Sequence, residues 1–198
     1  MSITRTVLAL AAVAVVAAGC GDDSTTHTTE HSSTTTASTT SATARTDFDD
    51  ADVTFLQMMY PHHAQAVEMS KMVPSRTQNQ QLIALAAQIE QAQAPEMRQI
   101  TDLLTSFGKP APSAEGHGGH GMPGMMTEEQ MSALEAAKDA EFDRQWLQMM
   151  IEHHQGAVAM AQTELAEGIN PEAKQLATKI VADQEGEIAT MRGMLGQS

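Results

Sequence analysis

The chain repeats itself at an offset of 91 residues, and this repeat constrains the fold more than any other feature. Phe55–Met69 and Trp146–Met160 align without a gap, and nine of their fifteen residues are identical. The same register continues downstream, where Glu96 aligns with Glu187. Because chance does not hold one register over so long a stretch, two copies of one supersecondary unit are the economical explanation.

Each copy has the apolar spacing of two helices. In its first segment the apolar line advances in steps of four and three, through Phe55, Met59, His62, Ala66, Met69 and Val73. A second segment has a similar stripe, through Leu82, Leu85, Ile89, Gln93, Glu96, Ile100 and Leu104. This is a helical period, and no segment shows the alternation of a strand. The sequence therefore predicts an all-α, up-down four-helix bundle made of two repeated hairpins.

Turn and capping signals divide these helices. Pro74 with Ser75 is expected to break the first hairpin, and Gly168–Pro171 the second. Thr127–Gln130 is a capping box that opens the third helix, with a break expected near Lys138 and Asp139. Pro61 removes a backbone donor beside the first histidine pair and is expected to kink that helix.

The N-terminal part of the chain is expected to lie outside the bundle. Residues 1–20 resemble a bacterial lipoprotein signal peptide that ends at Cys20, with plain secretion and an incidental free cysteine as the alternative. Residues 21–46 are rich in Ser and Thr and predict a disordered tether. The bundle domain is then residues 47–198, including a Gly/His/Met linker at 108–126. We therefore expect the protein at the extracytoplasmic face of the cell membrane, anchored by lipid.

Charge and composition exclude several functions. A net charge of −14 argues against a general nucleic-acid binder. One cysteine in 198 residues excludes an intramolecular disulfide, a Cys-based zinc site and an iron–sulfur cluster. The 15 methionines are several times the usual share and need an explanation.

Histidine and methionine recur together in both copies. His62 and His153 lie on the core line, and His63 and His154 follow its flanking edge. Imidazole and thioether ligands together select Cu(I) over zinc, iron or magnesium. The candidate copper ligands are therefore Met59, His62, His63, Met69, Met150, His153, His154 and Met160. The alternative is that these methionines are flexible core filler and the histidines are hydrogen-bonded core residues.

Three further patterns add to this prediction. The linker contains five potential metal ligands, expected to be weaker and more exposed: His117, His120, Met122, Met125 and Met126. Polar residues interrupt the second and fourth stripes and are expected to hydrogen-bond the ligand imidazoles: Gln93, Glu96, Gln184 and Glu187. Glu152 precedes the second histidine pair and is expected to raise its imidazole pKa.

The doubled motif M-M-x-x-H-H-x-x-A-V-x-M, each followed by a Q-x-x-E helix, resembles the domain-of-unknown-function 305 family (DUF305). The resemblance covers residues 47–195 and implies a ferritin-like four-helix fold in a bacterial secreted protein or lipoprotein. It places the family's characteristic positions on Met59, His62, His63, Ala66, Met69, Met150, His153, His154, Ala157 and Met160. It also favours copper, because some members are linked to copper binding and tolerance.

Two other functions are compatible with a helical bundle. A di-iron oxidase would need Glu-x-x-His motifs, and the chain contains none. A non-metal interaction lipoprotein would use methionine-rich grooves to bind a partner helix or peptide. Copper sequestration, tolerance or delivery, without catalysis, is the function that the sequence favours.

Overall fold

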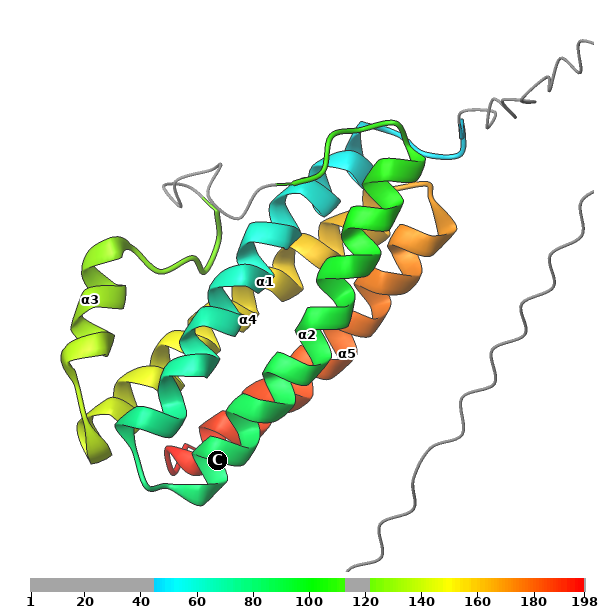
Figure 1. Cartoon of the computed structure of the whole chain (residues 1–198). Coiled ribbons are helices and arrows are strands. Elements are labelled where there is room, and N and C mark those ends of the chain that lie inside the picture. Colours follow the sequence, from blue (N-terminus) through cyan, green and yellow to red (C-terminus); the bar gives the residue numbers. More distant parts are fainter. Residues whose placement is uncertain (1–44, 113–121, 198) are drawn as a thin grey trace, which may run out of the picture. The chain divides into compact units, whose positions relative to one another are not determined.

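The computed structural model describes residues 45–112 and 122–197 and shows an all-α fold (Figure 1). Its helices are α1 (Asp50–Arg76), α2 (Gln80–Ser106), α3 (Glu128–Ala136), α4 (Asp139–Glu167) and α5 (Pro171–Met194). The predicted signal peptide with Cys20, residues 21–44 of the predicted tether, and the linker residues His117 and His120 lie outside the described residues. Arg45, in the last part of the predicted tether, is described and forms an ion pair with Asp47 at 2.7 Å.

All the described helices except α4 begin at a side chain that accepts hydrogen bonds from the first backbone N–H groups. Asp49 forms a capping box for α1, and Asn79 and Asn170 cap α2 and α5. The predicted capping box at Thr127 opens α3, and the expected break separates α3 from α4.

The expected break at Pro74 and Ser75 is wrong, because α1 continues to Arg76 with both Pro61 and Pro74 inside the helix. The chain turns only at residues 77–79, where the Asn79 side chain accepts hydrogen bonds from the first backbone N–H groups of α2.

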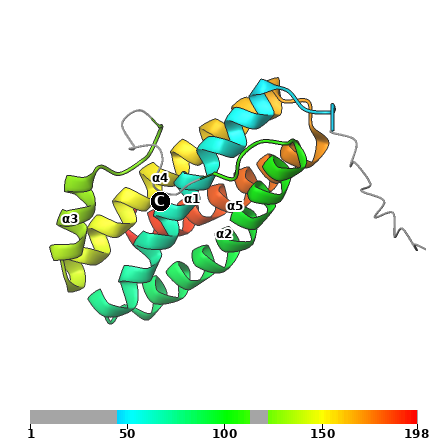
Figure 2. The same ribbon diagram turned by 45° about the horizontal axis from the view of Figure 1, so that its top comes forward.

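The two hairpins pack with α1 against α4, in antiparallel directions. The Trp146 indole near the start of α4 donates to the Met69 carbonyl in the last third of α1, at 2.9 Å. At the other end, the backbone N–H of Asn170 donates to Asp52, also at 2.9 Å. The chain between α2 and α4 must therefore travel the length of the bundle (Figures 1 and 2). One long crossover of this kind is typical of ferritin-like bundles.

The apolar interior is divided into two clusters. The Trp146 cluster includes Met69, Phe142, Trp146 and Met150, and the Phe55 cluster includes Phe55, Leu56, Met59, Leu104 and Met160. Along α1 and α4 the histidine pairs lie between residues of one cluster and residues of the other. The core therefore contains a polar layer with apolar packing on both sides.

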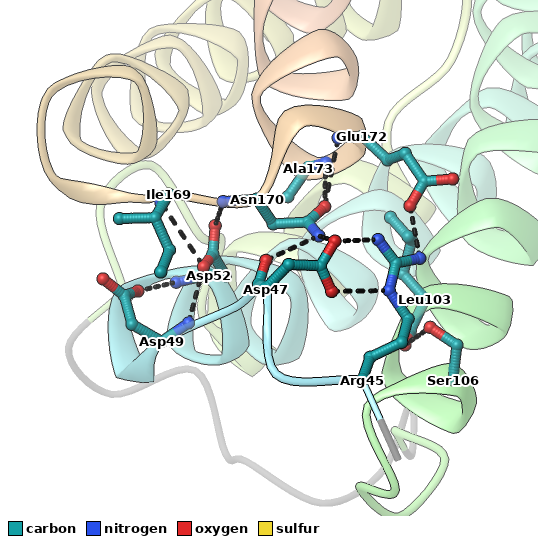
Figure 3. Close-up of polar contacts among 10 residues, drawn as sticks. All are labelled: Arg45, Asp47, Asp49, Asp52, Leu103, Ser106, Ile169, Asn170, Glu172 and Ala173. Carbon is teal, nitrogen blue, oxygen red and sulfur yellow. Dashed lines mark hydrogen bonds and ion pairs between the residues drawn. The ribbon is translucent and has the colours of Figure 1, made fainter. Parts of the chain in front are cut away.

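Polar contacts close the end of the bundle where α4 turns into α5 and α1 begins (Figure 3). Asp52 is fully buried and accepts the backbone N–H of Asp49 at 2.8 Å, as well as that of Asn170. Burial alone would raise the pKa of Asp52, but these bonds hold it below its usual value. Burial and the neighbouring Asp52 carboxylate raise the pKa of Glu164 to about 8.

None of the helices in the described part of the chain is long and apolar enough to cross a membrane.

The raised pKa of Glu164 predicts a pH dependence of folding. The folded state holds a proton that the unfolded state releases near the ordinary glutamate pKa of 4.5, so this stabilisation is complete below that pH. It is lost as the pH rises through about 8. Glu164→Gln keeps the neutral donor at every pH and should raise the free energy of unfolding at pH 9 by on the order of 2 kcal/mol. Urea unfolding at pH 5, 7 and 9 measures this change, with the exposed Glu167→Gln as the control. Parallel pH profiles of the wild type and Glu164→Gln would contradict the prediction.

Candidate metal centre

The four paired histidines lie in the polar layer, and each is fully buried. His62 and His153 come from α1 and α4 and meet with their ring centroids 3.8 Å apart and an interplanar angle of 39°. Adjacent residues of a helix point about 100° apart, so the second histidine of each pair must face a different neighbour. The predicted core line through His62 and His153 thus brings the two copies of the motif together.

The second histidine of each pair bonds to the other helix of its own hairpin. His63 Nε2 lies 2.8 Å from Glu96 Oε2, and His154 Nε2 lies 2.6 Å from Glu187 Oε2. The two glutamates predicted to hydrogen-bond these imidazoles therefore do so, and the repeat is preserved in the contacts as well as in the sequence.

These bonds fix which ring nitrogens are free to bind a ligand. A carboxylate or carbonyl oxygen accepts, so the ring nitrogen facing it carries the hydrogen. This applies to His63, His154 and also His62, whose Nε2 donates to the Pro123 carbonyl at 3.1 Å. The Nδ1 atoms of all three rings are buried without a hydrogen-bond partner, and neither ring nitrogen of His153 has one. Several imidazole lone pairs are thus left unpaired inside the protein.

Burial keeps the central pair neutral. It lowers the pKa of His62 to about 3 and that of His153 well below its usual value, and neighbouring histidines lower both further. The expected rise caused by Glu152 is wrong for His153, because Glu152 is exposed to solvent and burial of the ring dominates. Neutral imidazole is the form that binds metal.

The four candidate methionines are buried on both sides of the histidine layer. Met59 and Met160 belong to the Phe55 cluster, and Met69 and Met150 belong to the Trp146 cluster. Each cluster thus contains one methionine from each copy of the motif.

Gln93 and Gln184 lie in the same part of the core and are 2% and 3% exposed. Neither polar atom of the Gln93 side chain has a hydrogen-bond partner, and the Gln184 oxygen has none. The prediction that these glutamines are buried is confirmed, but they do not bond to the imidazoles as the glutamates do.

The two halves differ in the charge beside their glutamates. Lys179 of α5 donates to Glu96 at 2.8 Å. Although burial alone would raise the pKa of Glu96, the hydrogen bonds from His63 and Lys179 hold it below its usual value. The repeat aligns Lys179 of α5 with Gln88 of α2. The position that supplies a cation to Glu96 therefore holds a neutral glutamine in the half of the bundle that would face Glu187.

The linker segment Met122–Met126, here called the strap, lies against the histidine layer. Gln65 holds it through the Met126 backbone, accepting from the N–H at 2.8 Å and donating to the carbonyl at 2.9 Å. Gly156 makes room for it, because a Cβ there would lie 2.0 Å from the Pro123 carbonyl oxygen. Gln65 and Gly156 occupy equivalent positions in the two copies of the motif. This difference between otherwise similar copies was visible in the sequence and could have indicated that the two helix faces have different neighbours.

The strap contains three of the five predicted linker ligands. Met122 and Met125 are partly buried, whereas Met126 is buried in the Trp146 cluster. Met126 therefore packs as a core residue and is not part of an exposed capture site.

Within residues 45–112 and 122–197, no three His, Cys, Asp or Glu side chains converge as a metal site would require. Zinc and di-iron centres are built from such groups. A metal held in this layer would therefore need thioether ligands in addition to imidazole.

Comparison with known proteins identifies the family of this chain. The model of the family described as "Domain of unknown function (DUF305)" matches residues 52–195. The chain belongs to the DUF305 family. A DUF305 fragment from Deinococcus radiodurans is 37% identical, with a TM-score of 0.69 over 76% of this chain and 98% of that one. A DUF305 protein from Streptomyces coelicolor is 36% identical, with a TM-score of 0.67 over 74% of this chain and 93% of that one.

This DUF305 chain is also similar to CopM. The Cu(I)-bound form of CopM is 30% identical, with a TM-score of 0.61 over 72% of this chain and 94% of that one. CopM has also been solved in Cu(II)-bound and Ag-bound forms. No curated protein matches the chain.

The unpaired nitrogens of His153 predict that this residue destabilises the metal-free protein. A buried polar group without a partner costs about 1–3 kcal/mol. His153→Leu should therefore raise the free energy of unfolding of the metal-free chain by about 1–2 kcal/mol. The matched change His154→Leu should lower it, because it leaves Glu187 without its hydrogen bond. Urea unfolding in the presence of a chelator measures both changes, and equal losses in the two variants would contradict the prediction.

Proposed function

We propose that this protein binds Cu(I) outside the cytoplasm, for copper sequestration, tolerance or delivery, while held to the membrane by a lipid at Cys20. The observation that carries the proposal is the close contact of the His62 and His153 rings, which are buried with unpaired ring nitrogens. The rings lie between two clusters that each contain two of the four methionines of the repeated motif.

The donor set suits a soft monovalent ion. Thioethers and neutral imidazoles are uncharged, so the bound ion adds only its own single positive charge to the core, and the softness of these ligands favours Cu(I) over Zn(II). The orphaned nitrogens of His62, His63, His153 and His154 fit this role. Met59, Met69, Met150 and Met160 would complete the set of ligands. Glu96 and Glu187 would orient the imidazoles and offset the charge of the ion.

The similarity to CopM supports the choice of metal. CopM has been solved in Cu(I)-bound and Ag-bound forms, and Ag(I) is a soft monovalent ion like Cu(I). The linker pair His117 and His120 remains a candidate for an additional, weaker capture site.

The first test compares Cu(I) with Zn(II) in competition titrations of the full chain. Replacing the four candidate methionines by leucine keeps their volume and should cost less than about 1.5 kcal/mol of stability for each residue. It should weaken Cu(I) binding at least tenfold and leave Zn(II) binding unchanged.

A matched control replaces four methionines outside the candidate set: Met72, Met97, Met131 and Met194. This control should bind Cu(I) like the wild type. Unchanged Cu(I) affinity after substitution of both the candidate methionines and the four histidines would refute the proposed site.

The anchor is tested separately through Cys20. Lipidation of the only cysteine would place the protein in the membrane fraction, and Cys20→Ser should release it into the soluble extracytoplasmic fraction. Fractionation and mass spectrometry of the mature N-terminus measure this release. Detection of an unmodified Cys20 in the wild-type protein would contradict the prediction.

A further inference from the structure

A groove of about 490 Å³ lies between the first half of α1 and the last half of α4. Phe55 and Met58 of α1 line it from one side, and Met160 of α4 lines it from the other. Asp50 and Glu167 are exposed residues that also line it. The groove is thus apolar inside and acidic at its edge.

The repeat identifies a second copy of this groove at the other end of the same two helices. The offset of 91 residues takes Phe55 to Trp146 and Met58 to Met149, and it takes Met160 back to Met69. All three equivalents belong to the Trp146 cluster or pack against it.

The second copy is covered by α3. Leu134 of α3 is fully buried in the Trp146 cluster, and Met131 packs against that cluster. These two residues lie one helical turn apart, so a short amphipathic helix is what this type of groove accepts.

Among the described residues, no second short helix corresponds to α3 at the open groove. The residues 91 positions before Met131 and Leu134 are Thr40 and Thr43, in a segment of Ser, Thr and Ala. The apolar side chains that would fill the open groove are therefore missing from the corresponding part of the sequence.

Charge indicates what kind of helix would fit. At the covered copy, Val73 and Arg76 stand where the open groove has Glu164 and Glu167. The covering helix α3 is acidic, with Glu128 and Glu129 in its first turn. Since the open groove has the exposed Glu167 carboxylate in place of the Arg76 cation, it favours a helix of opposite charge to α3.

We propose that the open groove binds a short amphipathic helix of a partner protein, with Met and Leu one turn apart and with Lys or Arg beside them. Pro123 of the strap also lines the groove. The partner would therefore contact Met160 and the segment that bonds to His62. The docking site stands independently of the proposed copper function.

The test uses the full chain with ¹³C-labelled methionine methyl groups and a synthetic peptide as the probe. The peptide has the sequence of residues 127–138 with Glu128→Lys, Glu129→Lys and Glu135→Lys. Titration should shift the Met58 and Met160 methyl signals to saturation. The same peptide with its native glutamates should bind at least tenfold more weakly.

Two variants locate the binding site. Ala159→Trp fills the groove from an exposed position, and Glu167→Lys reverses a charge at its edge. Each should weaken peptide binding at least tenfold. The matched exposed changes on α5, Ala182→Trp and Glu185→Lys, should leave it unchanged.

Other outcomes would overturn the proposal. Shifts at Met69 and Met149 alone would mean that the peptide only competes with α3. Self-association that Ala159→Trp abolishes would make a second copy of the chain the occupant. Binding that appears only after deletion of residues 1–44 would mean that this chain covers its own groove. If no methyl signal shifts to saturation with either peptide, the groove does not bind such a helix and the proposal is wrong.

Discussion

The central constraint on this bundle is that it buries four imidazoles in the middle of its core. Two of them are satisfied by glutamates from the neighbouring helix, but Nδ1 of every ring is left without a partner. Each unpaired group costs about 1–3 kcal/mol, so the helices must recover this cost elsewhere. They do so through the apolar clusters on both sides of the layer and through well-capped helix ends. Such a conflict between local and global stability is typical of a binding site.

The layer has nearly twofold symmetric contacts, and the single crossover connection breaks that symmetry. The strap bonds to His62 and passes over Gly156. No segment within residues 45–112 and 122–197 makes the equivalent hydrogen bond with His153. The same crossover places α3 over one α1–α4 groove and leaves the other open. Lys179 adds a charge difference between the halves. The two histidine pairs therefore differ in their surroundings.

Much of the site could be predicted from the sequence because repetition and helical period are local signals. The core line through His62 and His153, the flanking role of His63 and His154, and the bonds to Glu96 and Glu187 are all confirmed.

Predictions that depended on the solvent exposure of a side chain were less reliable. Glu152 adjoins His153 in sequence but lies in solvent, and Met126 belongs to a flexible-looking linker yet is buried. Pro74 did not end α1, because the cap at Asn79 sets the turn.

The sequence by itself determined the helices, their pairing into two hairpins, the residue types of the central layer and membership of the DUF305 family. Spacing along a helix fixes which side chains share a face, and that requires no knowledge of other helices. Only the tertiary structure decided which ring nitrogens are free, which groove is covered and how the strap is held. These features arise where segments distant in the chain meet, and no local periodicity encodes the outcome of that packing.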